Sequence, residues 1–499
     1  MVSDLRPNFM DYVSRMENFF LRRVSLCRLA FFMFFVAFIP RLHLAFTSMT
    51  PVACDEIFQT VEIAHRIVFG RGFRFWEWHN GLRSYSLPAF FTPPYFLAKW
   101  TGIENPRIVT VLVKSYLALF HALGITLLFL AFSKISDRFR AFFAVLPMAL
   151  WYVAGFISVR TLGETAAIPF IFLMLYLNVK AEEERRGFYN FFSGMAAGFA
   201  FMLRIQTLAF SAGLGVFLLI FSRERIRSAY LFTAGCVVVI VFQGLLDLYT
   251  WGSFLHSFFA YMDFNFFQDG ASRFGTSPWY FYFIKTYEIW PVLFIVPAVF
   301  FLFTASFSKK YARFTLPVIL FSAIHIATPH KELRFLFPVF IMLPFLTMGG
   351  IELLSTRFSN KNFSKIFVFS SLIIVFTTMF SIPFYPERWA YSHEKNNYAN
   401  SNVSFLLGSV PDVKHAWAFR SQKDFTGGHA WFNSDATIHY VRKISDSKQM
   451  FKNILRRKNC EGCYIAVRKA DKKYFLQYKK RLRKIKETDN WLIFRIISG

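Results

Sequence analysis

Residues 52–62, VACDEIFQTVE, and the apolar segment just before them decide the fold. Residues 29–47 are mostly apolar and long enough to cross the roughly 30 Å of hydrocarbon in a bilayer. Two adjacent acids, Asp55 and Glu56, follow at the mouth of this first segment. Ionisable groups are costly at a membrane boundary and often mark a functional site. The stretch therefore predicts a membrane protein with polar chemistry at the ends of its helices.

The composition supports this class. The chain has 499 residues, of which 55% are hydrophobic and 20% are aromatic, and its mean hydropathy is +0.38. Soluble chains average about 45–50% apolar residues by a count that includes glycine. The net charge of +27 could indicate a nucleic-acid partner, but the basic residues gather between apolar runs and in the C-terminal tail. That distribution favours membrane topology and anionic headgroups over nucleic acid.

Apolar segments of about span length recur along the chain and predict an α-helical polytopic membrane protein with about eleven transmembrane helices. The predicted spans are residues 29–47, 108–132, 139–158, 164–179, 188–204, 205–221, 229–250, 278–305, 312–328, 333–353 and 366–383.

Basic clusters predict how these spans are oriented. The clusters are residues 1–28, 133–140, 180–186, 222–227, 308–313 and 355–365. The positive-inside rule places all of them in the cytoplasm. The loop 48–107 and the tail then lie on the other side, provided that SLPAFFTPPYFLAKW (86–100) does not cross. Pro88, Pro93 and Pro94 favour an interfacial or re-entrant element there.

Three domains follow from this pattern: a cytoplasmic arm (1–28), a membrane domain (29–383) that includes the outer loop 48–107, and a soluble domain (384–499) on the non-cytoplasmic side. The alternating stretches CYIAVRK and WLIFRII in the tail predict strands, and hence a small α/β domain. Cys460 and Cys463 are two free thiols or one small disulfide.

Asp55 and Glu56 are the candidate catalytic residues. Two interpretations stay open for Asp55, because an acid at this position also favours the N-terminus of the helix predicted from EIFQTVEIAHRIVF. The carboxylate could cap that helix, act in chemistry, or do both.

Cations on the same predicted side are candidates for binding a phosphate. The segment PHKELRF (329–335) is a tight turn between apolar runs, which is either a solvated turn or a site for a lipid phosphate. For Arg160 and Glu164 in SVRTLGET, a structural ion pair is the simpler interpretation. The candidate phosphate- or substrate-binding residues are His330, Lys331, Glu332, Arg334, Arg160, Arg204 and Arg83.

Aromatic residues mark two further segments, WEWHNGLRSYS (76–86) and FGTSPWYFY (274–282). Trp76, Trp78 and Trp279 belong to membrane-interface belts or offer flat surfaces to a sugar.

Together these residues predict sugar transfer from a lipid-phosphate donor. A carboxylate would take the proton from an acceptor hydroxyl as general base. Cations would hold the departing phosphate and stabilise its developing charge. A monophosphate leaving group calls for no metal in principle, and the prediction includes neither a metal nor a cofactor.

The segment VACDEIFQTVEIAHRIVFGRGFRFWEWHNGLRSYSLP closely resembles the first outer loop of the GT-C mannosyltransferases of family 22. SVRTLGET, PHKELRFLFPV and FGTSPWYFY resemble later blocks of that family. The resemblance implies a GT-C fold and an inverting, metal-independent transfer of mannose from dolichyl- or polyprenyl-phosphate-mannose to a lipid-linked glycan. By similarity Asp55 is the base and the turn at residues 330–332 is a donor-phosphate site.

Among branches, the first block looks most like the GPI-anchor enzymes that add the third mannose in an α1,2 linkage. This implies an active site in the lumen of the endoplasmic reticulum. The sequence departs from the family at Ala53-Cys54, where a His-Pro pair or similar is usual. An N-glycan enzyme, or a bacterial enzyme acting at the periplasmic face of the inner membrane, stays open. A lipid transporter or flippase is the alternative from another class, because membrane charges also line substrate pathways.

Overall fold

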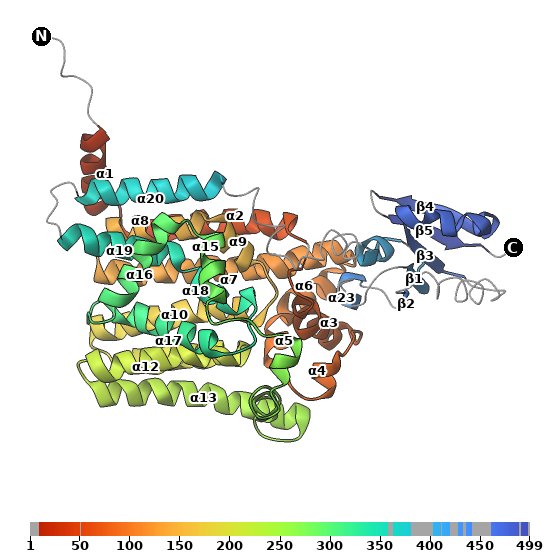
Figure 1. Ribbon diagram of the computed structural model, residues 1–499, viewed down its shortest axis with the longest axis horizontal. Helices are drawn as coiled ribbons and strands as arrows, with labels where there is room; N and C mark the ends of the chain where they lie inside the picture. The colour runs from red at the N-terminus through yellow and green to blue at the C-terminus, as the bar shows by residue number, and fades with distance from the viewer. Residues whose placement is uncertain are drawn as a thin grey trace, which may run out of the picture. The chain divides into compact units, whose positions relative to one another are not determined.

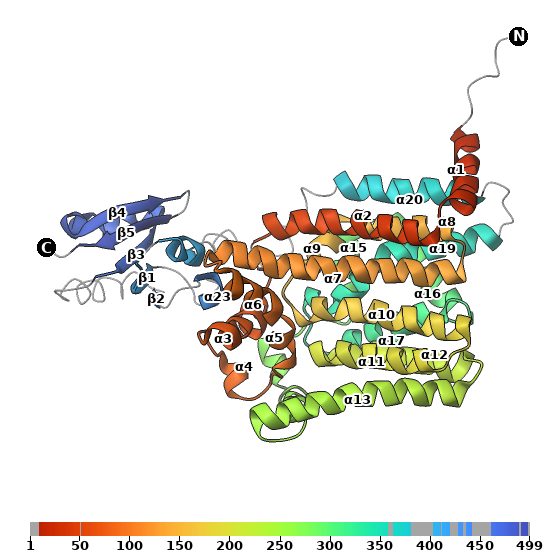
Figure 2. The ribbon, with the colours of Figure 1, turned by 180° about the vertical axis from the view of Figure 1, so that it is seen from behind.

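The computed structural model describes residues 9–49, 51–357, 363–380, 403–410, 412–419, 428–432, 436–441, 461–488 and 491–497. The chain forms two compact units that do not follow chain order. We call residues 1–48, 80–87 and 115–386 the helical unit, and residues 49–79, 88–114 and 387–499 the sheet unit. The segments can be followed in Figures 1 and 2.

Most of the helical unit is α-helix. Its helices are α1 (Phe9–Arg23), α2 (Leu26–Thr47), α8 (Arg138–Leu150), α9 (Tyr152–Ser158), α10 (Gly163–Glu184), α11 (Phe188–Leu203), α12 (Leu208–Phe221), α13 (Arg225–Trp251), α14 (His256–Met262), α15 (Phe281–Ile289), α16 (Val292–Ala305), α17 (Ala312–Ala327), α18 (Phe337–Phe340), α19 (Leu343–Arg357) and α20 (Phe363–Phe380). Short 3-10 and π turns are η2 (Ile205–Thr207), η3 (Asp263–Phe267), η4 (Gly270–Phe274) and η5 (Leu333–Leu336). The helix α7 (Pro106–Ile135) begins in the sheet unit and ends in this one.

Several helices are long and apolar enough to cross a membrane. Within the described residues these are α2, α7, α10 and α13, and two bent pairs, α8 with α9 and residues 333–354, raise the number to six. Five more apolar helices have 10–17 residues. Large side chains on α13, among them Phe242 and Leu245, are exposed, as expected for a surface that contacts lipid tails. The chain is therefore an integral, multi-pass membrane protein.

Three predicted spans are broken. The span predicted at 333–353 bends by 43° between Phe340 and Leu343, and prolines account for the other two breaks. The span predicted at 278–305 is interrupted at Trp290 and Pro291 between α15 and α16, because Pro291 has no N–H to continue the first helix. The span predicted at 139–158 bends by 68° after Pro147. There Arg41 of α2 is fully buried and donates hydrogen bonds to the carbonyls of Met148 and Ala149 (3.3 and 2.7 Å). The guanidinium thus satisfies backbone groups at the break.

Glycines let neighbouring helices approach closely. The helices α10 to α13 run side by side in both views (Figures 1 and 2). A Cβ atom on Gly194 of α11 would lie 1.8 Å from the carbonyl oxygen of Phe232 on α13, and one on Gly235 would lie 1.9 Å from that of Phe191. Small residues at such contacts are typical of helices packed in membranes.

The sheet unit combines the first outer loop with the tail. The loop contributes the π-helix η1 (Glu56–Val61), α3 (Glu62–Phe69), α4 (Trp76–His79) and α6 (Thr92–Thr101), and α5 (Ser86–Phe90) lies at its boundary. At 5 and 10 residues, α5 and α6 are too short to cross a bilayer. The tail contributes α23 (Gly428–Phe432), the 3-10 turns η8 (Lys469–Tyr474) and η9 (Leu476–Arg481), and five strands.

The strands form one mixed sheet in the order β2-β1-β3-β5-β4. They are β1 (His415–Phe419), β2 (Thr437–Val441), β3 (Cys463–Arg468), β4 (Leu482–Glu487) and β5 (Trp491–Ile496). β1 pairs in parallel with β2 and β3, whereas β5 runs antiparallel to β3 and β4. The two strands predicted in the tail are β3 and β5, so the prediction of strands at these two stretches is confirmed.

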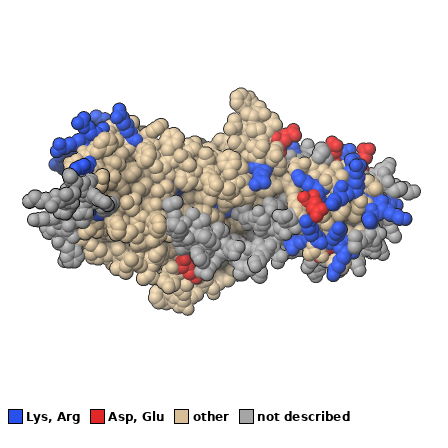
Figure 3. All heavy atoms as spheres, turned by 90° about the horizontal axis from the view of Figure 1, so that it is seen from above, with Lys and Arg blue, Asp and Glu red and all other residues tan. Residues whose placement is uncertain are grey.

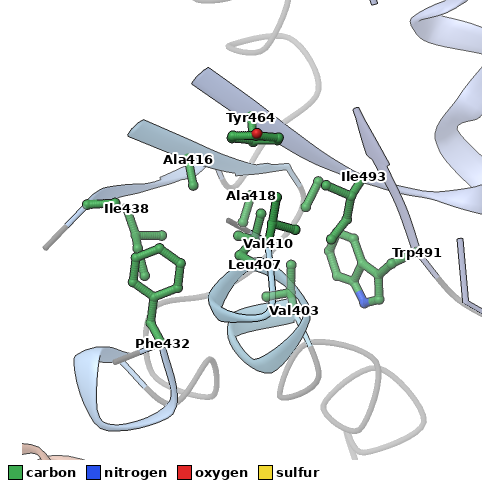
Figure 4. Close-up of a cluster of buried hydrophobic side chains, with 12 residues drawn as sticks. Val403, Leu407, Val410, Ala416, Ala418, Phe432, Ile438, Tyr464, Trp491 and Ile493 are labelled. Atoms are coloured by element: carbon green, nitrogen blue, oxygen red, sulfur yellow. The ribbon is translucent and has the colours of Figure 1, made fainter. Parts of the chain in front are cut away.

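Both faces of this sheet bury apolar side chains. One face packs against residues 403–410 and 432, where Leu407, Phe432 and Trp491 belong to a buried apolar cluster (Figure 4). On the other face, Ile465 and Phe475 belong to a second buried cluster. Lys and Arg side chains gather on the surface of the C-terminal part (Figure 3). The edge strand β4 is exposed over most of its length and carries Arg483, Lys484 and Lys486. Charged side chains on an edge strand oppose pairing with another chain.

Cys463 is buried and disulfide-bonded, and Cys460 lies outside the described residues.

Candidate active site

Asp55 and Glu56 begin a π-helical turn in the sheet unit. Of the interpretations left open for Asp55, helix capping is not seen, because its backbone is already helical (φ −62°, ψ −29°) and its side chain makes no cap hydrogen bond. The Glu56 carboxylate is 2% exposed and accepts a hydrogen bond from the Val52 N–H at 2.6 Å. Asp55 is only partly buried. Of the two acids, Asp55 is thus the more exposed, and Glu56 orders the preceding turn.

The aromatic residues of the first outer loop have different environments. Trp78 is 1% exposed, and its indole N–H donates to the Phe58 carbonyl at 2.9 Å, so its rings are packed inside the sheet unit. Trp76 is 37% exposed. In the helical unit, Trp279 is 65% exposed. Trp76 and Trp279 thus keep surface that a sugar or a headgroup could contact, and Trp78 does not.

In the helical unit, two blocks singled out in the sequence meet each other. The HKE turn, which we define as His330, Lys331 and Glu332, and the Pro329 before it are joined to the segment 274–282 by several hydrogen bonds, one of them from the Tyr282 hydroxyl to the Glu332 carbonyl at 3.2 Å. His330 Nδ1 lies 2.6 Å from the Gly275 carbonyl, Lys331 Nζ donates to the Ser277 carbonyl at 3.0 Å, and the Ser277 N–H donates to the Pro329 carbonyl at 3.0 Å.

Arg334 completes the HKE turn from the first residues of η5. Its guanidinium binds Glu332 through two hydrogen bonds, at 2.7 and 3.0 Å. Glu332 also lies 3.2 Å from His330 Nε2. Lys331 is buried, and its ammonium also donates to the Thr328 carbonyl at 2.5 Å. The Lys331 side chain therefore holds the turn in shape through backbone carbonyls.

A second arginine reaches the same place from the end of α11. The guanidinium of Arg204 lies 5.3 Å from the centre of the Phe335 ring, as does that of Arg334, and the His330 ring lies 5.7 Å from it. We call Arg204, His330 and Arg334 the basic cluster. The ring quadrupole attracts cations over its face, and both guanidiniums also pair with a carboxylate, Arg334 with Glu332 and Arg204 with Glu164. Phe335 thus brings together cations from two distant parts of the sequence.

The ion pair expected between Arg160 and Glu164 is replaced by another. Glu164 pairs with Arg204 at 2.9 Å, and both side chains are buried. Arg160 lies over the ring of Phe156 and donates to the Ser48 carbonyl at 3.0 Å. The reason is geometric, because α10 begins at Gly163, where a Cβ would lie only 2.6 Å from the Leu203 carbonyl. That close approach puts the first turn of α10 beside the end of α11.

Arg83 lies in the short loop 80–87 of the helical unit. Its carbonyl accepts a hydrogen bond from the Trp251 indole at 3.1 Å, and its guanidinium is 5.9 Å from the centre of the Tyr261 ring. The loop is fastened by the buried Asp247, which accepts from Ser84 at 2.7 Å.

The pKa values of the HKE turn are shifted by its own contacts. The hydrogen bond to Glu332 raises the pKa of His330 above its ordinary value, although partial burial acts in the other direction. Burial alone would raise the pKa of Glu332, but the charge of Arg334 and the hydrogen bonds from His330 and Arg334 hold it well below its usual range. Burial lowers the pKa of Lys331. His330 therefore keeps its proton to a higher pH than a free histidine.

Several residues of the site were missed in the sequence. Phe335 is one of many phenylalanines and carries no local signal. Glu62 does carry one, because it follows Asp55 by seven residues and helical periodicity puts such residues on one face. It is fully buried in the sheet unit.

The chain is similar to a known protein family and to several known proteins. The model of the Alg9-like mannosyltransferase family matches residues 30–386. GPI mannosyltransferase 3 of Yarrowia lipolytica is 27% identical over 336 residues, which are 66% of this chain and 63% of that protein. Mannosyltransferase APTG1 of Arabidopsis thaliana is 26% identical over 62% of this chain and 56% of its own length. The chain thus spans about three-fifths of the length of these two curated relatives.

Human GPI alpha-1,2-mannosyltransferase 3 is 23% identical over 80% of this chain and 73% of its own length. The crystal structure of ArnT from Cupriavidus metallidurans bound to undecaprenyl phosphate matches with a TM-score of 0.57 at 11% identity, over 94% of this chain and 97% of that one. At such low identity the likeness shows a common fold alone. The matched family region, by contrast, covers most of the chain and contains both the acid pair and the HKE turn, and the chain belongs to the Alg9-like mannosyltransferase family.

Proposed function

We propose that this protein is an inverting glycosyltransferase that moves mannose from a polyprenyl- or dolichyl-phosphate-mannose donor to a lipid-linked glycan. The observation that carries the proposal is the family match over residues 30–386. The basic cluster around Phe335 adds chemical support, because it gathers two guanidiniums and an imidazole that favours its protonated form, a combination suited to a phosphate monoester.

In this mechanism Asp55 is the general base. Its carboxylate takes the proton of the acceptor hydroxyl as the oxygen attacks the anomeric carbon of the mannose from the face opposite the phosphate. The bond between that carbon and the phosphate oxygen breaks, and the configuration inverts. The lipid phosphate leaves with the bonding pair, and the basic cluster stabilises the charge that develops on it.

The other residues have supporting roles in the proposal. Lys331 and Glu332 shape the HKE turn, and Glu56 holds the segment before Asp55. Arg83 and Arg160 lie in the helical unit as additional cations for substrate binding. Trp76 and Trp279 are the proposed contacts for sugar or acceptor, because both keep exposed ring surface.

The acceptor we propose resembles a GPI precursor, with transfer in an α1,2 linkage. The support is that relatives from a yeast, a plant and a mammal carry GPI-mannosyltransferase or mannosyltransferase names. An N-glycan-type lipid-linked oligosaccharide or a bacterial envelope glycan would suit the same core.

We further propose the eleven-span topology, with the active site in the lumen of the endoplasmic reticulum in a eukaryote or at the periplasmic face in a bacterium. The disulfide at Cys463 supports an oxidising compartment for the tail.

The test is transfer of radiolabelled mannose by the purified full-length protein in detergent. The donor is dolichyl-phosphate-mannose and the acceptor is a GPI precursor bearing two mannoses. Asp55→Asn keeps the size of the side chain but cannot accept the proton, so we expect the rate to fall by about 10²-fold or more with donor binding retained. Full activity of Asp55→Asn would show that Asp55 is not the general base. Transfer to an N-glycan precursor instead of the GPI precursor would assign the protein to the N-glycan branch of the family.

The transfer assay also separates an enzyme from a transporter, because a flippase would leave the labelled mannose on its lipid phosphate. Movement of the labelled lipid between the leaflets of a vesicle, without transfer of mannose, would identify a flippase.

A further inference from the structure

Glu62 is a buried acid that the proposed reaction does not use. It is the first residue of α3 and is fully buried. Its carboxylate accepts hydrogen bonds from three backbone N–H groups, those of Phe73, His429 and Ala430, at 2.9, 2.9 and 2.8 Å. Phe73 lies in the first outer loop, whereas the other two belong to α23 in the tail. One carboxylate thus ties together segments more than 350 residues apart in the sequence.

The tail is shaped to receive this carboxylate. Gly428, the first residue of α23, has a positive φ of 54°, which glycine adopts without strain. A Cβ atom there would lie 2.6 Å from one carboxylate oxygen of Glu62 and 2.7 Å from the other. The oxygens therefore occupy the space that any other side chain would need. A negative charge at the first turn of a helix also satisfies N–H groups that have no partner within the helix.

The first outer loop is built around the same residue. The loop after α3 folds back so closely that a Cβ on Gly72 would lie 2.4 Å from the Glu62 carbonyl. The Phe73 ring lies 4.9 Å from the ring of His429, and α23 packs against both α3 and η1. Contacts from both sides therefore fix the direction of the helix that carries Glu62.

That helix also carries Asp55. The π-turn η1 runs without a break into α3, so residues 56–69 form one continuous helical element and Asp55 stands at its first end. A tilt of this element would move the Asp55 carboxylate. A displacement of about 1 Å in a catalytic group can cost about 10²-fold in rate.

We propose that Glu62 is a positioning residue, through which the C-terminal domain holds the helix of Asp55 in its catalytic place. The proposal rests on the proposed function for the role of Asp55. Under this proposal the tail contributes to the geometry of the active site, whereas the sequence predicted a separate soluble domain.

The test compares Glu62→Gln and Glu62→Asp with the unmodified full-length protein in the transfer assay. The amide introduced by Glu62→Gln keeps one acceptor oxygen and points its NH₂ group at a backbone N–H, so at least one of the two hydrogen bonds to α23 is lost. We expect kcat to fall by about tenfold or more, with the KM for dolichyl-phosphate-mannose changed less than about threefold. Glu62→Asp keeps the charge and should recover part of kcat. Glu487→Gln, which changes an exposed acid of the same domain, is the matched control and should leave both constants unchanged.

Gly428→Ala tests the same contact between Glu62 and α23 by changing the tail instead of the first outer loop. Its methyl group would displace the carboxylate, so it should lower kcat as Glu62→Gln does. Because both variants break one contact, the double variant should be no worse than the more damaged single variant. Additive losses would overturn the proposal, and so would normal kcat in Glu62→Gln.

Hydrogen–deuterium exchange gives a readout that does not depend on catalysis. In Glu62→Gln, peptides that contain Phe73, His429 and Ala430 should exchange faster than in the unmodified protein. Unchanged exchange at these amides would contradict the coupling. If the unmodified protein transferred no mannose and Glu62→Gln still exchanged faster, the coupling would stand and the proposed function would fail.

Discussion

At the scale of single residues, hydrogen bonds and ion pairs hold the charged groups of the candidate site. Glu56, Lys331 and Glu332 are engaged with backbone groups or with neighbouring cations. Asp55 makes no cap hydrogen bond at its helix, and Arg204 and Arg334 stand over Phe335. Arg204 and Arg334 are themselves buried and paired with Glu164 and Glu332, so these charged groups form a connected network.

His330 gives a prediction for pH. The bond to Glu332 raises the pKa of His330, so its positive charge is present below that pKa and is lost as the pH rises through it. The pKa of Glu332 is held low, so this carboxylate stays ionised throughout a neutral assay range. We expect the KM for the donor to increase as the pH rises, with little change in kcat, when initial rates are measured across that range.

The control for this profile is His330→Gln, which has no titrating group at that position. Its donor KM should be higher than normal at neutral pH and should no longer rise with pH. A variant profile that still follows that of the unmodified protein would assign the pH dependence to another group.

The ion pair of Glu164 gives a second prediction at this scale. Glu164→Gln leaves the buried Arg204 without its carboxylate, and breaking a buried pair costs about 3–5 kcal/mol. We expect a lower temperature of unfolding in detergent. Lys285→Gln, which breaks the more exposed pair with Glu288, serves as comparison and should change the unfolding temperature far less. Equal effects would mean that the Arg204 pair is not buried as described.

At the scale of elements, the helical unit is stabilised by close contacts between helices rather than by burial of apolar surface away from water. Lipid tails are as apolar as the helices, so packing and satisfied polar groups hold the helical unit together. The α11–α13 contact at Gly194 and Gly235 is an example of the first, and Arg41 at the break between α8 and α9 is an example of the second.

The α11–α13 contact can be tested with one methyl group. A Cβ on Gly194 would lie 1.8 Å from the Phe232 carbonyl oxygen, so Gly194→Ala must push the two helices apart. Overpacking costs typically about 1–3 kcal/mol. We expect a lower unfolding temperature and a smaller monodisperse yield by size-exclusion chromatography.

Gly215→Ala is the matched control, because a Cβ at that position of α12 meets nothing within 4 Å. It should leave the unfolding temperature unchanged or raise it slightly, since alanine is the better helix former. If both alanine variants behaved alike, the glycine contact would have no special role.

At the scale of the whole molecule, the proposed reaction requires Asp55 and the HKE turn to face one aqueous compartment. We expect an impermeant maleimide added from the lumenal or periplasmic side to label both Asp55→Cys and His330→Cys in membranes. The free cysteines Cys27, Cys54 and Cys236 are replaced by serine beforehand. An outer-side reagent that reached one position, while only a cytoplasmic reagent reached the other, would refute the mechanism.

Much of the helical architecture could be predicted from the sequence, because the length and apolarity of a segment are local properties. The breaks at Trp151 and Trp290 were harder to foresee, since a proline in a membrane helix is tolerated where a neighbour satisfies the freed backbone groups. That neighbour is Arg41 at the first break, and it lies over 100 residues away in the sequence.

By itself, the sequence determined the class of the protein, the positions of its apolar segments, two strands of its tail and the blocks that resemble a mannosyltransferase family. Only the tertiary structure decided which charges meet. It paired Glu164 with Arg204, set Arg204 and Arg334 over Phe335, and joined the first outer loop to the tail through Glu62. The physical reason is that hydrophobicity accumulates along a segment, whereas an ion pair or a shared carboxylate depends on distances between segments that no local pattern specifies.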